Sequence, residues 1–367
     1  MRPRWRPVLD KLTPYDAGKP IEDELRAGAL ARLSANESPL GPSPRAVDAI
    51  RREAGRVHLY PDGGSTELRE ALGRQFGVGA DWIVVGNGAD EVLALLARAA
   101  FDPGDEVLLP QPSFEPYGSE ATLSGAALVH SPLRGYETDL ADMSQRVTPR
   151  TKAVFLCTPH NPASTIIRRG PIEEFLKGLG EDPPLCIVDE AYRDFCDDPE
   201  TVDGVDLVRR YPNVIALRTF SKIAGLAGLR VGYAVASAEA IDRFNRVRAP
   251  YNVNRLGQVA ALAALEDHDH QEKTVRLVLE ERAYLSAELT KRGYAFPPSH
   301  ANFLLVAVPD AAGVRARLMR EGILVRDGAG VGFPGHLRLP SGCARRTRSY
   351  CPCSSLVSSS SSHAVIA

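Results

Sequence analysis

The stretch VIALRTFSKIAGLAGLRVGYAVA, residues 214–236, decides the class of fold. Aliphatic residues dominate its two ends, 214–218 and 230–236, as is typical of two strands of a sheet. Ser221 and Lys222 follow the first strand directly, in a segment of small residues. Because ligands of open α/β sheets bind beyond the carboxyl ends of the strands, the stretch predicts a polar site at one sheet edge.

Further strands and helices alternate on the N-terminal side of this stretch. Amphipathic segments such as 89–101 place Val92, Leu95 and Leu96 on one helical face. Short aliphatic runs predict five more strands, at 82–86, 106–110, 126–130, 153–157 and 185–189. This alternation predicts an α/β fold with a mainly parallel sheet.

The chain divides into four parts by composition. Residues 1–45, rich in Pro and Gly, predict an N-terminal arm that also contributes to a small domain, and 46–245 form the large domain. Residues 246–339 predict a smaller α+β domain, with helices at 255–267, 271–292 and 311–321 and strands at 302–308 and 323–327. Residues 340–367, rich in Ser and Cys, form an atypical tail.

Opposite charges balance in this chain. Lys and Arg total 44 and Asp and Glu total 46 in 367 residues, which gives a formal charge of −2. This balance excludes a broad basic surface, so we expect neither nucleic acid nor an anionic membrane as a partner. No apolar run reaches the ~18 residues of a membrane span, and the first residues lack the apolar core of a secretory signal. We therefore expect a cytoplasmic, soluble enzyme.

Cysteine and histidine spacing predicts no metal site. Cys157, Cys186 and Cys196 are isolated, and the other three cysteines lie in the tail. His268 and His270 have no second cluster of ligands near them in the sequence, so we expect a solvated loop there.

Two of the predicted strand ends carry groups suited to binding an anion or a ring. Gly86 to Ala89 lead from a strand into a helix, whose first amides can bind phosphate, although a simple glycine turn is the alternative. A dinucleotide fingerprint would need a glycine where Glu91 stands. Asn161 follows another strand and precedes Pro162, a pattern that also makes an ordinary turn.

The other two strand ends carry groups suited to catalysis. Asp189 ends a buried strand, where an unpaired carboxylate is costly, and Tyr192 follows within the same turn; a helix cap is the alternative. Lys222 is one of only seven lysines in a chain that prefers arginine. Lysine can form an imine or act as a base, which arginine cannot, although an ordinary surface lysine remains the alternative. With Arg230, these groups fit one ligand that bears a phosphate and a protonated ring.

Several motifs together resemble a known family. They are ANESPLGPSP (35–44), YPDGG (60–64), GNGADE (86–91), PSFEPYG (112–118), DEAY (189–192), SKIAGLAGLRVGY (221–233) and LVRDG (324–328). Over about 12–338 the chain is similar to the fold-type I pyridoxal-phosphate (PLP) enzymes, and among them to the histidinol-phosphate aminotransferase family. The resemblance implies a large domain with a mainly parallel sheet and a smaller α+β domain.

The same resemblance implies roles around the cofactor ring. Lys222 would hold PLP as an imine, and Asp189 would keep the pyridine nitrogen protonated. Tyr192 and Asn161 would bind the phenolic oxygen of the ring, and Tyr117 would stack on its face.

Further residues are implied for the phosphate, the substrate and a second subunit. The amides of Ala89 and Asp90, with Ser221 and Arg230, would hold the cofactor phosphate. Tyr60 would reach the phosphate in a neighbouring subunit, which implies a homodimer with shared sites. The substrate side would comprise Asn36, Arg326 and Arg338.

The implied reaction is a ping-pong transamination between an amino donor, histidinol phosphate, and a 2-oxo acid, 2-oxoglutarate, with Lys222 moving the proton. An aromatic or branched-chain aminotransferase, or a phosphothreonine-type decarboxylase, would use the same cofactor residues. A PLP-binding pseudoenzyme without catalysis and a nucleotide-binding dehydrogenase are the alternatives from other classes.

The chain departs from the family in two places. The family's Asn-Pro-Thr-Gly is NPAS here, at 161–164, and the family's ending after Arg338 is replaced. Codons for Pro340 to Thr347, read one base out of register, can spell Thr-Val-Gly and then acidic residues, as the family would continue. We hypothesise that the residues from about Pro340 onward are a frameshifted reading, which resequencing the gene would test.

Overall fold

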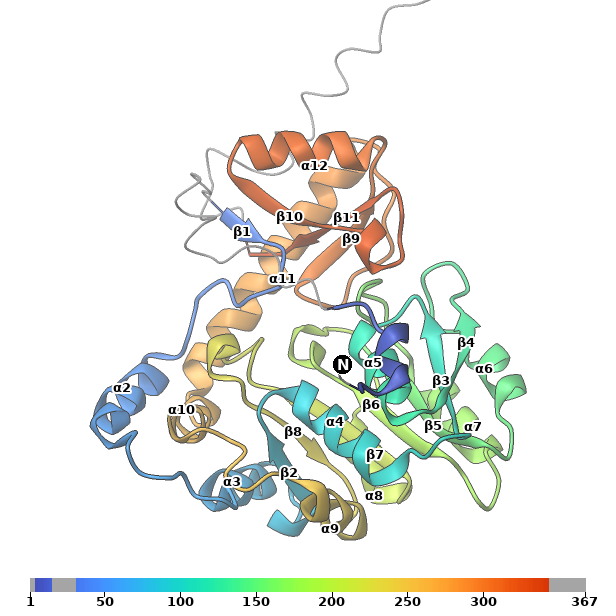
Figure 1. Cartoon of the computed structure of the whole chain (residues 1–367). Helices are drawn as coiled ribbons and strands as arrows, with labels where there is room; N and C mark the ends of the chain where they lie inside the picture. The colour runs from blue at the N-terminus through green and yellow to red at the C-terminus, as the bar shows by residue number, and fades with distance from the viewer. Residues whose placement is uncertain (1–3, 15–30, 343–367) are drawn as a thin grey trace, which may run out of the picture.

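Two sheets of different size organise the molecule, whose computed structural model describes residues 4–14 and 31–342 (Figure 1). The larger sheet has the strand order β2 (Ile83–Gly86), β8 (Gly232–Val235), β7 (Val214–Thr219), β6 (Leu185–Asp189), β5 (Thr151–Cys157), β3 (Glu106–Gln111) and β4 (Ala127–Pro132). The smaller sheet has the order β1 (Ala31–Leu33), β10 (Ile323–Asp327), β11 (His336–Pro340) and β9 (Phe303–Ala307). We call the larger sheet with its helices the large unit, and the smaller sheet with its helices the small unit.

The large sheet is parallel except at β8. Strands β4, β3, β5, β6 and β7 pair in parallel, and β8 is antiparallel to both β7 and β2. A parallel return after β7 would need a long crossover, but 220–231 contains only the short 3-10 helix Ala227–Leu229. The predicted α/β fold with a mainly parallel sheet is confirmed.

Apolar side chains cover both faces of this sheet. Along β5, the neighbours Val154 and Phe155 belong to different buried clusters, as do Ile187 and Val188 along β6. Successive side chains of a strand point to opposite faces, so each cluster lies on its own face. The helices in this part of the chain are α2 (Pro44–Glu53), α3 (Thr66–Phe76), α4 (Ala89–Ala100), α5 (Glu115–Ser124), α6 (Leu140–Arg146), α7 (Arg169–Gly178), α8 (Gly204–Arg210), α9 (Ala238–Val247) and α10 (Arg255–Leu265).

The small unit contains one strand from each end of the described chain. Strand β1 pairs in parallel with β10, although nearly the whole chain separates them, and β11 pairs with both β10 and β9. The sequence predicted β9 and β10 but neither β1 nor β11. Helix α12 (Ala311–Arg320) packs on this sheet, and α11 (His268–Lys291) runs from the large unit to the small one (Figure 1).

The expected loop at His268–His270 is wrong, because these residues form the first turn of α11. Asp267 caps that turn by accepting a hydrogen bond from the amide of His270.

Besides Ala227–Leu229, 3-10 helices lie at Pro7–Lys11, Ala54–Arg56, Ala80–Trp82, Arg193–Phe195 and Ala329–Val331.

The frameshift hypothesis falls almost wholly outside the described residues. Pro340 ends β11, where it pairs with Phe303, and the description stops at Gly342. The hypothesis therefore stays a prediction. Among the helices that the structure describes, none is both long and apolar enough to cross a membrane.

Candidate active site

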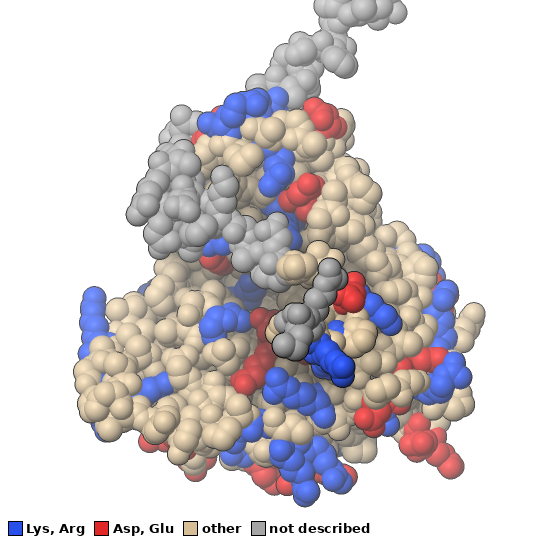
Figure 2. All heavy atoms as spheres, in the orientation of Figure 1, with Lys and Arg blue, Asp and Glu red and all other residues tan. Residues whose placement is uncertain are grey.

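One pocket lies where the two units meet, at the carboxyl ends of the parallel strands. It has a volume of about 360 Å³. Its walls come from the segments after β2, β5, β6 and β7, and from β10 and β11 of the small unit. Figure 2 shows this face hollowed between the units, with basic and acidic atoms side by side in the hollow. The four strand ends that the sequence singled out therefore face one space.

The first turn of α4 forms one end of this pocket. A Cβ on Gly232 would lie 2.3 Å from the Ala89 nitrogen, so only glycine lets β8 approach the start of the helix. Arg230 has a left-handed backbone (φ 55°), and its guanidinium is 2.8 Å from the Asp90 carboxylate. Ala89, Asp90 and Arg230 line the pocket together with Ser221. Helix amides and a guanidinium form a suitable site for a phosphate.

Asp189 ends β6 at the floor of the pocket and is only 4% exposed. Its carboxylate accepts the amide of Ala191 at 3.0 Å and the hydroxyl of Tyr117 at 2.5 Å. Burial raises the pKa of the Asp189 carboxyl, although the hydrogen bond from Tyr117 opposes this. Among the described residues, no ion pair to Asp189 is found. The site therefore holds a buried carboxylate that a cationic ligand would stabilise.

Tyr117 lines the pocket beside Asp189. Its ring stacks on Phe155, with 4.5 Å between the centroids, and burial raises the pKa of its hydroxyl well above the usual value. The hydroxyl occupies one carboxylate oxygen of Asp189. Stacking of Tyr117 on a bound ring stays a prediction.

Lys222 enters the pocket from the segment after β7. Its Nζ donates to the carbonyl oxygen of Ala35 at 3.0 Å and lies 5.5 Å from the centre of the Tyr192 ring. Beside it, the hydroxyls of Thr219 and Ser221 lie 3.0 Å apart. Among the residues that the structure describes, the amine therefore has one hydrogen-bond acceptor, a neutral carbonyl that a reacting group can replace.

The small unit supplies guanidinium groups to the opposite wall. Arg338 donates to the side-chain oxygen of Asn161 at 2.9 Å and to the carbonyl of Ser34 at 2.7 Å. Arg326 lines the same wall, and its Cα pairs with that of Arg338 across β10 and β11. The altered NPAS turn keeps Asn161 at the pocket, with Ser164 in a left-handed conformation (φ 64°).

Two predicted residues do not line this pocket within one chain. Asn36 lies behind Tyr192, where its side-chain nitrogen is 3.1 Å from the Tyr192 hydroxyl. Tyr60 is 78% exposed and stacks on Tyr251, with 4.6 Å between the ring centroids. The substrate contact of Asn36 and the intersubunit contact of Tyr60 stay predictions.

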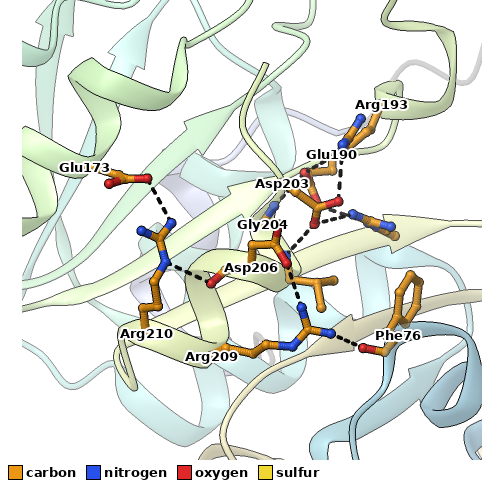
Figure 3. A network of polar contacts seen from close by, with 11 residues as sticks. Phe76, Glu173, Glu190, Arg193, Asp203, Gly204, Asp206, Arg209 and Arg210 are labelled. Atoms are coloured by element: carbon orange, nitrogen blue, oxygen red, sulfur yellow. Dashed lines mark hydrogen bonds and ion pairs between the residues drawn. The ribbon is translucent and has the colours of Figure 1, made fainter. Parts of the chain in front are cut away.

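A buried ionic network fixes the two strand ends behind the pocket (Figure 3). Glu190, next to Asp189, accepts the amide of Gly204 at 2.8 Å and Nε of Arg218 at 2.9 Å. Asp203 caps α8 and contacts both Arg218 and Arg193. Burial raises the pKa of the Glu190 carboxyl, and the positive charge of Arg218 opposes this. Because Glu190 directly follows β6 and Arg218 is on β7, the network holds Asp189 and Lys222 in register.

Sequence reasoning did not select several of the pocket residues, among them Thr219, Arg32 and Ala35. Thr219 stands beside Ser221, which was predicted to bind the phosphate, and its place at the end of a predicted strand could have identified it. Arg32 and Ala35 reach the pocket from the segment that begins with β1. No local hydrophobic pattern predicts β1, because its partner strand β10 lies near the other end of the chain.

The chain belongs to the class I and II aminotransferase family, whose model matches residues 30–349. Within that family it is similar to named enzymes. It is 43% identical to histidinol-phosphate aminotransferase of Symbiobacterium thermophilum over 94% of this chain and 96% of the relative. It is 42% identical to that of an Anaeromyxobacter strain over 92% of this chain and 94% of the relative.

A solved structure extends the likeness to three dimensions. Histidinol-phosphate aminotransferase of Sinorhizobium meliloti, crystallised in complex with pyridoxal-5′-phosphate, superposes with a TM-score of 0.87. It is 27% identical, and the match covers 98% of this chain and 99% of that one. An aspartate aminotransferase from Thermus thermophilus, at 24% identity and a TM-score of 0.84, shares the fold.

Proposed function

We propose that this protein is a PLP-dependent aminotransferase that transfers the amino group of histidinol phosphate to 2-oxoglutarate. The observation that carries the proposal is that Lys222, Asp189 and Arg338, from three separate segments, line one pocket. The relatives at about 40% identity, named for this reaction, support the choice of substrate.

The pocket residues fit PLP at both ends. The buried Asp189 carboxylate suits a protonated pyridine nitrogen, because a cation lowers the cost of burying the charge. The α4 amides, Arg230, Ser221 and Thr219 suit its phosphate. The Lys222 amine lies in the same space and suits its aldehyde.

PLP, when bound, supplies an aldehyde that reacts with amines and a cationic ring that withdraws electrons from the carbon bearing the amine. The side chains of the protein orient the cofactor and move the proton. Asp189 keeps the ring nitrogen protonated, and Asn161 and Tyr192 bind the phenolic oxygen. Lys222 Nζ takes the proton from the Cα of the amino donor, which requires that the amine be unprotonated at that moment.

The guanidinium groups on the small unit fit the anionic end of the substrate. Arg338 binds the phosphate of histidinol phosphate or a carboxylate of the 2-oxo acid, and Arg326 assists it. Arg32 lines the same pocket and adds positive charge. Histidinol phosphate carries a phosphate and 2-oxoglutarate carries two carboxylates, so the same guanidinium groups serve an anion in both halves of the reaction.

We further propose a cytoplasmic homodimer with shared sites. The exposed apolar side chains of Val57, Leu59, Tyr60 and Tyr251 support a subunit contact around Tyr60. The large domain spans 46–245, and residues 1–45 and 246–339 make up the arm and the small domain. The two sheets and the strand β1 support this division, except that α10 packs in the core of the large unit.

A half-reaction assay tests the proposed function. Histidinol phosphate, phenylalanine and phosphothreonine are each mixed with the PLP-loaded protein, and the visible absorbance is followed. We expect histidinol phosphate to remove the visible band fastest and 2-oxoglutarate to restore it, which is the ping-pong pattern. Lys222→Ala is the matched control and should show no turnover. Faster reaction with phenylalanine, or release of CO₂ from phosphothreonine, would overturn the choice of substrate.

A further inference from the structure

Asn36 makes a buried contact that links the N-terminal segment to the large unit. It is 1% exposed, and its Nδ2 lies 3.1 Å from the hydroxyl oxygen of Tyr192, which is 5% exposed and lines the pocket. Asn36 itself does not line the pocket. The contact therefore acts on Tyr192 from behind.

The backbone of Asn36 is held as firmly as its side chain. Its φ of 54° is left-handed, a conformation that asparagine adopts more readily than most residues with a side chain. Nδ2 of the fully buried Asn302 donates to the Asn36 carbonyl at 3.1 Å, and the carbonyl of Asn302 accepts the amide of Ser341 at 2.8 Å. The amide of Asn36 is thus presented to Tyr192 in one orientation.

The direction of this hydrogen bond decides where the Tyr192 proton can go. An asparagine Nδ2 only donates, so the Tyr192 oxygen accepts from Asn36 and keeps its own proton for another acceptor. We propose, on the basis of the proposed function, that Asn36 is a positioning residue that directs the Tyr192 hydroxyl proton to the phenolic oxygen of PLP.

The proposal has a consequence at Lys222. A hydrogen bond donated to the phenolic oxygen stabilises negative charge there and weakens its attraction for a proton on the nearby Lys222 nitrogen. Lys222, once joined to PLP, then loses its proton at a lower pH. The other charged groups that face this region are Asp189 of β6, Asp90 of α4, Arg230 before β8 and Arg338 of β11. Arg32, Glu37 and Arg326 lie in the same pocket.

The test is a pH titration of the visible absorbance of the PLP-loaded protein. Asn36→Gly removes the amide and still accepts the left-handed backbone. We expect the midpoint to rise by about half a pH unit, since a neutral hydrogen bond has an effect of that order. Tyr192→Phe should raise it further, and the double variant should match Tyr192→Phe alone, because Asn36 acts through Tyr192.

A control and a second variant keep the test decisive. Asn213→Gly removes a comparable amide, bound to the Pro184 carbonyl at 2.8 Å in another part of the large unit, and should leave the midpoint unchanged. If Asn36→Gly does not fold, Asn36→Asp keeps the size but can only accept when ionised, and should raise the midpoint at least as much.

Three results would overturn the inference. An unchanged or lowered midpoint in Asn36→Gly would show that Asn36 does not direct the proton as proposed. Shifts that add in the double variant would show that it acts without Tyr192. Both results leave the proposed function intact, whereas a parent protein with no pH-dependent visible band would overturn the proposed function and this inference together.

Discussion

His160 shows how a single residue adapts to burial beside the pocket. It lies between β5 and Asn161, is buried, and its Nδ1 accepts the amide of Ala163 at 3.2 Å. Burial lowers the pKa of His160 from 6.5 to about 4. Only the neutral ring can accept that amide, so protonation would break a hydrogen bond as well as place a charge in the interior.

The lowered pKa of His160 predicts a pH dependence of stability. Between pH 6.5 and about 4, His160 is protonated in the unfolded chain but neutral in the folded chain. The free energy of unfolding therefore falls as the pH falls through this window. The loss amounts to about 3 kcal/mol. His160→Asn should remove this part of the pH dependence in urea unfolding at several pH values. His58→Asn, at an exposed site, is the control and should keep the parent's pH dependence. Identical curves for parent and His160→Asn would contradict the assignment.

At the scale of elements, the sequence predicted the ends of the central strands but not the segment that begins with β1 and reaches the pocket. Asp189 ends one aliphatic run and Lys222 follows another, and the rule that ligands bind at carboxyl ends brings such residues together whatever the strand order. Strand β1 has three residues and pairs with β10 far along the chain, so no local pattern reveals it. The contact of Asn36 with Tyr192 depends on that pairing and could not be foreseen.

The interpretation of the histidines failed for a different reason. Asp267 stands one residue before His268 and is a good helix-capping residue, a local feature that predicts a helix start. The start of α11 depends on the single hydrogen bond between Asp267 and the amide of His270, and the spacing of apolar residues does not predict such a bond.

The network behind β6 and β7 predicts a large effect of one substitution. Arg218→Met should remove the nearer cation of the buried Glu190 carboxylate, leaving Arg193 at 3.4 Å, and lower the free energy of unfolding by about 3 kcal/mol. Arg243→Met breaks an exposed pair with Glu239 and should cost less than about 0.5 kcal/mol. Denaturant unfolding measures both. Equal effects of the two substitutions would argue against a role of the network in holding the strand ends.

At the scale of the whole molecule, shared sites predict complementation between two defective chains. Lys222→Ala removes the reactive amine, and Tyr60→Ala removes the group proposed to reach the partner subunit. Refolding the two variants together gives hybrid dimers in which one site has both residues, so we expect up to about a quarter of the parent activity. Each variant refolded alone should stay near its own low activity. Activity equal to the mean of the two variants would mean that each site is complete within one chain.

The measurement that tests the account most directly is the position of the bond between the protein and PLP. The loaded protein is reduced with borohydride, digested, and its peptides are mapped by mass spectrometry. The account predicts one pyridoxyl group, on Lys222, and none in Lys222→Ala. A label on another lysine, such as Lys152 or Lys177, or a purified protein that takes up no PLP after reconstitution, would contradict it.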